Sequence, residues 1–214
     1  AITAHLKIPT MKTLDDRARS LVREAVSGQH PKAIILSCVD SRVPVEDVFD
    51  QGIGDVFVAR VAANIENTDI LGSMEFACKI AGTKLIVVLG HTKCGAVKGA
   101  CDHVEMGNLT ELLSKLQPAV YAESETTAVD KRNSKNSKFV ENVSSLNVRR
   151  GVKNIIERSF ILEEMLDKGE IGIVGAMYNI DTGKVEFYKD VSYINDEKNP
   201  TFSPDEKFVA FTRN

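Results

Sequence analysis

The decapeptide AIILSCVDSR begins as an apolar strand and ends in reactive side chains, with Cys38, Asp40 and Arg42 at intervals of two residues. About fifty residues later, another apolar run, KLIVVLG, is followed by His91 and, three residues further on, by Cys94. Two thiolates and one imidazole suit zinc, and three protein ligands leave a fourth position open, as in catalytic zinc sites. The sequence therefore predicts a catalytic zinc site.

Asp40 is the fourth candidate ligand, because it is close enough to Cys38 to reach the metal or a bound water. Arg42 follows two residues later, and a guanidinium holds a neighbouring carboxylate ionised and oriented through forked hydrogen bonds. Asp40 therefore has two possible states. Paired with Arg42, it can accept a proton from zinc-bound water. Released from Arg42, it can bind the zinc and shut the site.

Each of these features alone has an ordinary structural explanation. A cysteine at a strand end is usually a small core residue, and an exposed aspartate–arginine pair usually contributes little to stability. The features occur together after two strands of one predicted sheet, and this combination favours a metal site.

The remaining cysteines are not expected to bind the metal. Cys78 lies in an amphipathic stretch and is interpreted as a core residue. Cys101 and His103 are two residues apart, which would direct them to different sides of a helix. A chain of 214 residues with ample core does not need disulfides, so the four cysteines are expected to be thiols or ligands.

The rest of the sequence alternates short apolar runs with amphipathic stretches, which predicts an α/β fold with a central, mostly parallel sheet flanked by helices. Strands are expected in the segments KAIILSC, DVFVARVA and KLIVVLG. Helices are expected over residues 13–28, 44–50, 69–82, 108–120 and 139–166, the last with a break near residue 158.

A C-terminal hairpin with its turn at residues 181–183 should add an antiparallel edge strand to the sheet. The polar segment 121–138 should form a surface loop or an irregular helix. The chain is then one domain, 1–214, with an N-terminal helical arm (1–28) and a C-terminal tail (189–214).

The predicted sheet explains how the candidate ligands could meet. Binding sites of open α/β sheets lie beyond the carboxyl ends of the strands, at a switch in strand order. Cys38 follows the first expected strand, and His91 and Cys94 follow the third. If these two strands are neighbours, the three side chains share one crevice.

Composition excludes several functional classes. With 27 basic and 30 acidic residues, the net charge is −3, which argues against binding to a nucleic-acid backbone. No apolar run approaches the roughly 20 residues that span a bilayer, so no membrane association is expected. No secretory segment is visible, and a cytoplasmic location is expected; a targeting segment removed from the N-terminus stays an open alternative.

The motifs CVDSR and GHTKCGAVKG, with their separation, resemble those of the β-class carbonic anhydrases. The similarity extends from about Gln29 to Lys98, and more loosely through LNVRRGVKNI and the hairpin. The resemblance implies that Cys38, His91 and Cys94 bind one zinc ion per chain. It also implies that the paired residues of CVDSR, an aspartate and an arginine, gate the metal and orient its hydroxide.

The same resemblance implies further site residues. Gln29 matches a glutamine that reaches the substrate pocket, typically across a dimer interface. Gly95 matches a glycine whose backbone approaches a bound anion, and Phe57 and Phe76 match apolar pocket positions. Family members are homodimers or assemblies of dimers, in which an N-terminal helix embraces the partner; residues 14–28 would form that helix here.

Two departures from the family pattern are informative. Phe76 replaces a tyrosine of many plant-like relatives, so a hydroxyl contact is lost. Ile35 replaces a tryptophan that one branch uses in an inhibitory bicarbonate site. We therefore expect no such inhibition, and water rather than Asp40 as the fourth zinc ligand near neutral pH, with Asp40 able to bind zinc at low pH.

The implied reaction is the reversible hydration of carbon dioxide to bicarbonate and a proton by zinc-bound hydroxide. Two thiolates should weaken the Lewis acidity of the metal relative to a site of three neutral histidines, whose bound water has a pKa of about 7. Activity should therefore rise with pH through the neutral to alkaline range. The alternatives are a carbon disulfide or carbonyl sulfide hydrolase on the same scaffold, and a non-enzymatic zinc module.

Overall fold

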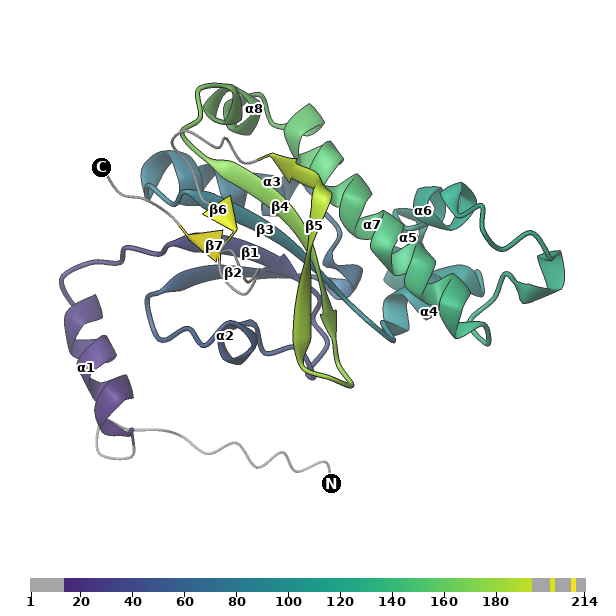
Figure 1. The fold of residues 1–214 in the computed structure, drawn as a ribbon, viewed down its shortest axis with the longest axis horizontal. Helices are drawn as coiled ribbons and strands as arrows, with labels where there is room; N and C mark the ends of the chain where they lie inside the picture. Colours follow the sequence, from purple (N-terminus) through teal and green to yellow (C-terminus); the bar gives the residue numbers. More distant parts are fainter. Residues whose placement is uncertain (1–13, 194–200, 203–208, 211–214) are drawn as a thin grey trace.

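The computed structural model describes residues 14–193, 201–202 and 209–210. Its central sheet has five strands in the order β2-β1-β3-β4-β5 (Figure 1). The first four are parallel and β5 is antiparallel to β4, which confirms the predicted fold class. The strands are β1 Ala33–Ser37, β2 Val56–Arg60, β3 Leu85–His91, β4 Gly172–Asn179 and β5 Lys184–Tyr193.

The central strands are apolar because both of their faces are covered. Every residue of β1 and of β3 is buried, whereas exposed and partly buried residues alternate along the first part of β5. Continuous apolar runs are typical of parallel strands inside an α/β domain, and alternation is typical of an edge strand. β5 continues to Tyr193, so residues 189–193 belong to the sheet and the expected tail begins later. Much of that tail lies outside the described residues.

Helices of different length connect and cover the strands. They are α1 Asp16–Ala25, α2 Val45–Val48, α3 Thr68–Glu75, α4 Gly95–Cys101, α5 Gly107–Ser114, α6 Gln117–Ala122, α7 Ser137–Arg158 and α8 Phe160–Asp167. Short 3-10 turns occupy Ala62–Asn64 and Val129–Lys131, a π-helical turn occupies Phe76–Ile80, and a small separate sheet pairs β6 Thr201–Phe202 with β7 Val209–Ala210.

Three apolar clusters make up the core. One joins α3, α7 and α8 to one face of the sheet, and a second places Val43 and Val45, which begins α2, against the other face. The third joins α4–α7 beyond the carboxyl ends of β1 and β3 and includes Cys38 and Cys94. In Figure 1, α7 begins beside α4, α5 and α6 and runs obliquely along the sheet toward α8. Cys38 and Cys94 are therefore packed against the layer formed by α4–α7.

The close packing of α7 on the sheet depends on strand glycines. A Cβ atom at Gly90 would lie 2.5 Å from Val148 Cγ2, and one at Gly175 would lie 2.9 Å from Val148 Cγ1. Since such distances are far below van der Waals contact, a side chain at either position would push α7 outward. Glycine in β3 and β4 thus sets the depth at which the longest helix sits.

Two of the expected helices differ in detail. The segment expected as one helix over 108–120 is two helices, α5 and α6, with Pro118 in the first turn of α6. Proline has no backbone N–H and cannot continue a preceding helix, so this prediction was wrong about continuity. The expected break near residue 158 is confirmed: Ser159 ends α7 and accepts a hydrogen bond from Leu162 N at 3.2 Å to begin α8.

The polar segment 121–138 is an irregular helical loop with one buried anchor. The carboxylate of Glu123, only 1% exposed, accepts hydrogen bonds from Arg132 Nη1 at 2.8 Å and Asn142 Nδ2 at 3.0 Å. Arg132 also donates to the carbonyl of Val120 at 2.7 Å. The loop is therefore attached to α6 and α7 rather than free on the surface.

The remaining structural expectations concern cysteines and membranes. All four cysteines are free thiols, as expected, and Cys78 is buried in the core beside α3. In the part of the chain that the structure describes, no helix is long and apolar enough to cross a membrane.

Candidate metal centre

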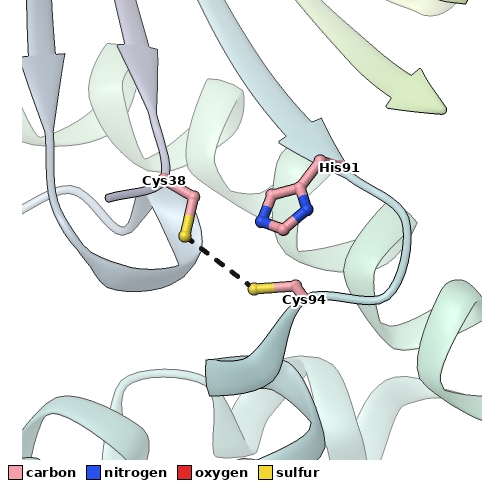
Figure 2. A group of neighbouring side chains, drawn as sticks. All are labelled: Cys38, His91 and Cys94. Atoms are coloured by element: carbon pink, nitrogen blue, oxygen red, sulfur yellow. Dashed lines mark hydrogen bonds between the residues drawn. The ribbon is translucent and has the colours of Figure 1, made fainter. Parts of the chain in front are cut away.

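The three predicted ligands converge at the carboxyl ends of β1 and β3. These strands are parallel neighbours, so Cys38 after β1 and His91 at the end of β3 emerge at the same edge. Cys94 caps α4 and closes the group. The possible ligand atoms all lie within 4.8 Å of one another, and the two sulfur atoms are 4.0 Å apart (Figure 2). All three residues are buried.

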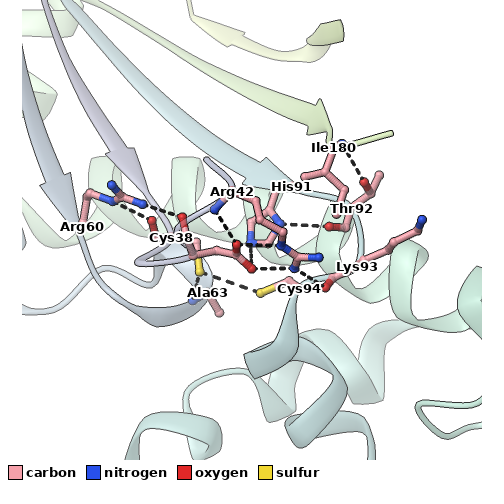
Figure 3. A network of polar contacts seen from close by, with 10 residues as sticks. Cys38, Arg42, Arg60, Ala63, His91, Thr92, Lys93, Cys94 and Ile180 are labelled. Atoms are coloured by element: carbon pink, nitrogen blue, oxygen red, sulfur yellow. Dashed lines mark hydrogen bonds and ion pairs between the residues drawn. The ribbon is translucent and has the colours of Figure 1, made fainter. Parts of the chain in front are cut away.

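The tight loop between His91 and Cys94 is held by the β4–β5 hairpin. Thr92 N donates to the carbonyl of Tyr178 at 3.0 Å. Ile180 N donates to Thr92 Oγ1 at 3.1 Å (Figure 3). Lys93 adopts a left-handed conformation, with φ 58°, that turns the chain back toward the site. The hairpin therefore helps to set the distance between the imidazole and the second thiol.

The segment around the first thiol is held by β2. Arg60, the last residue of β2, donates from Nε to the carbonyl of Cys38 at 2.9 Å and from Nη2 to the carbonyl of Asp40 at 2.6 Å (Figure 3). Ala63 N donates to Cys38 Sγ at 3.2 Å. Two backbone carbonyls and one sulfur thus accept hydrogen bonds from the last residue of β2 and from the turn that follows it.

The donor atoms fit a zinc ion. His91 Nδ1 is 2.9 Å from the carbonyl of Thr92, which requires that Nδ1 carries the proton and donates it. Nε2 is then a free acceptor, and it is buried without a hydrogen-bond partner among the described residues. A buried polar atom without a partner is costly, and a metal ion between Nε2 and two thiolates would satisfy it.

The two sulfur atoms lie within hydrogen-bonding distance of each other, and the pKa values of the two thiols shift in opposite directions. A hydrogen bond from Cys94 lowers the pKa of Cys38 against the effect of burial, and the backbone N–H groups of Asp40 and Ala63 act in the same direction as Cys94. The pKa of Cys94 is raised, first by its hydrogen bond to Cys38 and then by burial. The backbone N–H groups of Asp40 and Ala63 thus stabilise negative charge at Cys38, as a thiolate ligand requires.

Asp40 is paired with Arg42, which is the first of the two states expected for this carboxylate. Its Oδ1 accepts from Arg42 Nε at 2.9 Å and from Arg42 N at 3.0 Å, and its Oδ2 accepts from Arg42 Nη2 at 2.7 Å. These bonds keep the pKa of Asp40 well below its usual range. Oδ2 lies 3.9 Å from His91 Nε2, so the ionised carboxylate borders the metal position while its fork to the guanidinium is intact.

The other cysteines do not join this group, as expected. Cys78 and Cys101 are 2% and 1% exposed. Burial raises the pKa of each thiol to about 12, so both remain protonated and unreactive near neutral pH. Among the described residues, the only cluster of three or more suitable ligands is Cys38, His91 and Cys94.

The expected substrate residues are only partly near this centre. Gly95 begins α4 directly after Cys94 and is exposed beside the site. Gln29 is exposed before β1, at the end of that strand opposite Cys38. With a rise of about 3.3 Å per residue, β1 alone separates them by roughly 13 Å. Gln29 therefore does not reach the metal position of its own chain.

Phe57 and Phe76 lie together, away from the three ligands. Their rings meet edge to face with centroids 6.2 Å apart, and they line a shallow pocket of about 620 Å³ over β2 and α3. Half of the Phe76 side chain is exposed. Ile35, the position of interest for bicarbonate inhibition, is buried in β1 among aliphatic side chains, and the expected lack of inhibition stays a prediction.

Sequence reasoning missed three residues that support the centre: Arg60, Ala63 and Asn147. Asn147, on α7, donates from Nδ2 to the carbonyl of Ala63 at 2.9 Å. An arginine that ends an apolar strand is a weak sequence signal for Arg60. No local pattern marks Ala63 or Asn147, because their contacts join segments far apart in the chain.

Comparisons with known proteins agree with this geometry. A family model described as carbonic anhydrase matches residues 33–185. The chain belongs to the β-carbonic anhydrase family. Carbonic anhydrase 2 of Mycobacterium tuberculosis is 33% identical over 176 residues, which cover 80% of this chain and 81% of that protein.

Solved β-carbonic anhydrases share the fold. A tetrameric β-carbonic anhydrase of Sordaria macrospora superposes with a TM-score of 0.70 at 28% identity, covering 78% of this chain and 85% of the other. A β-carbonic anhydrase of Aspergillus fumigatus superposes with a TM-score of 0.67, also at 28% identity, covering 79% and 81%. The sequence resemblance and the predicted fold are therefore confirmed for this carbonic anhydrase.

Proposed function

We propose that this β-carbonic anhydrase catalyses the reversible hydration of carbon dioxide to bicarbonate and a proton, with one zinc ion bound by Cys38, His91 and Cys94. The observation that carries the proposal is the buried Nε2 of His91, which has no hydrogen-bond partner in the described part of the chain. It lies between two converging thiols and beside an ionised Asp40. Zinc held by these residues supplies a Lewis acid that makes water lose a proton more readily.

In this proposal, Asp40 accepts the proton and orients the attacking water. Its carboxylate is ionised because Arg42 donates two side-chain hydrogen bonds and one backbone hydrogen bond to it. Oδ2, which borders the metal position, can accept a hydrogen bond from water and direct a lone pair at carbon. Arg42 also donates from Nη2 to the carbonyl of Lys93 at 3.3 Å, which connects the base to the loop that carries Cys94.

The carboxylate has an alternative use when the guanidinium releases it. Asp40 can then turn toward the metal position and bind there, which would block water. Since the fork keeps the pKa of Asp40 low, the carboxylate stays available for either role over the physiological range. The forked pair in this structure supports the open state near neutral pH.

The substrate pocket is completed by a second copy of the chain in this proposal. Gln29 does not reach the metal position of its own chain. The pocket lined by Phe57 and Phe76 opens on the surface, away from the three ligands. α1 has no buried residue, and Val26 just after it is 84% exposed. A homodimer, or an assembly of dimers, would cover these apolar side chains and bring the partner's glutamine and phenylalanines toward the substrate.

The two alternatives are separated by substrate assays on one zinc-loaded preparation. Hydration of carbon dioxide is followed by proton release, and hydrolysis of carbonyl sulfide or carbon disulfide by sulfide release. We expect fast hydration and little sulfide. Sulfide release without hydration would assign the site to the sulfur substrates, and a tightly bound zinc without either activity would assign it a structural role.

A further inference from the structure

A strained turn lies directly against the first thiol. Ala63 has φ 57° and ψ 26°, the left-handed region, and its side chain is fully buried. This conformation is unfavourable for any residue with a Cβ atom. Asn64 follows with φ 44°, and Asn64 N donates to the carbonyl of Val61 at 3.0 Å to close the turn. Alanine keeps this conformation only if its surroundings hold it there.

The turn aims one N–H group at sulfur. Ala63 N is 3.2 Å from Cys38 Sγ and donates to it. A hydrogen bond to a thiolate draws negative charge from the sulfur, so the thiolate donates less charge to a bound metal. In a centre with two thiolates, this is a direct means of restoring Lewis acidity.

One buried side chain holds the turn from the opposite side. Asn147 lies on α7, is 7% exposed, and donates from Nδ2 to the carbonyl of Ala63 at 2.9 Å. The carbonyl and the N–H of Ala63 flank the same Cα atom. Fixing the carbonyl therefore restricts the rotation that would return Ala63 to an ordinary conformation and move its N–H away from sulfur.

We propose that Asn147 is a positioning residue of the metal centre, which acts by holding Ala63 in its left-handed conformation so that the Ala63 N–H donates to Cys38 Sγ. The inference rests on the zinc site proposed above. It assigns to α7 a part in tuning the thiolate, beyond its packing against the sheet.

The test uses the cobalt-substituted protein, because cobalt(II) bound to thiolate has a sulfur-to-metal charge-transfer absorption band that reports sulfur charge. We compare Asn147→Leu with the control Asn154→Leu. Asn154 lies on the same helix and donates to Glu66 Oε1 at 2.7 Å, without contact to a ligand. In Asn147→Leu the band should move to lower energy, and zinc affinity, measured by chelator competition, should fall by about 10-fold or more. The control should change neither.

A second substitution separates positioning from packing. Glycine adopts the left-handed conformation without penalty, so Ala63→Gly should need less support from Asn147. The double variant Ala63→Gly with Asn147→Leu should recover part of the band position and of the zinc affinity. A residue that merely fills space or satisfies a carbonyl would not be rescued in this way.

The possible outcomes are distinct. A shift in Asn147→Leu with recovery in the double variant supports the proposal. An unchanged band in a folded Asn147→Leu protein, or a shift without recovery, overturns it. If the leucine variant does not fold, Asn147→Ser, which is too short to reach the carbonyl, is held to the same criteria. A wild-type protein without the thiolate band would instead overturn the zinc site itself.

Discussion

At the residue scale, the chemistry depends on whether Asp40 stays paired with Arg42. Its two oxygens are occupied by Arg42, and its Oδ2 stands 3.9 Å from His91 Nε2. The carboxylate is therefore close enough to the metal position to receive a proton, and is not needed as one of the three convergent ligands. Turnover and metal binding should respond separately to substitution at this residue.

Asp40→Asn should retain zinc and lose turnover by about 100-fold or more, because the amide keeps the size of the side chain but cannot accept the proton. The hydration rate and the zinc content are measured on the same sample. Asp130→Asn, at an exposed carboxylate in the loop before α7, is the matched control and should behave as the wild type. Unchanged turnover in Asp40→Asn would remove Asp40 from the mechanism.

The ligands could be predicted from sequence because each stands in a short motif, and the sheet topology needed only two neighbouring parallel strands to join the motifs. Three supporting residues could not be predicted from sequence, because each acts through a backbone contact made across the fold: Arg60, Ala63 and Asn147. The role of Ala63 also depends on a left-handed conformation that alanine does not favour. Such a residue is visible only once the backbone is known.

At the element scale, the strands were predictable and the helix boundaries less so. Apolar runs identified β1 and β3 because both faces of these strands are buried. The division of residues 108–120 into α5 and α6 was signalled by Pro118, whose missing N–H separates the two helices. The π-helical turn Phe76–Ile80 has no comparable signal in the sequence.

Packing between α7 and β3 gives a prediction about stability. Gly90→Ala should lower the free energy of unfolding by about 1–3 kcal/mol, because the new Cβ would meet Val148 Cγ2 at 2.5 Å. In the double variant with Val148→Ala, the loss should be smaller than the sum of the two single losses. Urea unfolding of the four proteins tests this. Simple additivity would show that α7 moves away without cost.

The loop before α7 gives a second prediction, with a defined pH dependence. Burial acts to raise the pKa of Glu123, but hydrogen bonds from Asn142 and Thr126 and the charge of Arg132 outweigh it and hold the pKa below its usual range. Glu123→Gln should therefore lower the free energy of unfolding by about 2 kcal/mol at neutral pH. Because the folded-state pKa is lowered, this difference should be complete above about pH 5 and should shrink as the pH falls through the folded-state pKa.

The control for that experiment is Glu125→Gln, at a neighbouring carboxylate that is 65% exposed and pairs with Lys138. Exposed pairs contribute less than about 1 kcal/mol, so little change is expected. Equal effects of the two substitutions across the acid range would show that Glu123 does not anchor the loop.

At the scale of the whole molecule, the proposed site requires two chains. Gln29 lies at the opposite end of β1 from Cys38. The apolar residues of α1 are only partly buried, and Val26 and Phe76 are exposed. The sequence could imply this arrangement only through family resemblance, because a single chain carries no direct sign of what covers its surface.

Subunit complementation tests the shared site. Gln29→Ala and Asp40→Asn proteins are each expected to be weakly active. If the partner supplies Gln29, a mixed dimer contains one site with both wild-type residues. Random mixing at equal amounts should then restore roughly a quarter of the wild-type activity, since half of the dimers are mixed and half of their sites are intact. Activity that stays at the level of the parent proteins after verified exchange would place Gln29 outside the partner's site.

The most direct test of the central claim is stopped-flow hydration of carbon dioxide from about pH 6.5 to about pH 9, with zinc content determined on the same samples. The proposed function predicts fast hydration at about one zinc per chain, with a rate that rises with pH because the site must lose a proton to act. Full zinc occupancy without hydration at any pH would contradict it.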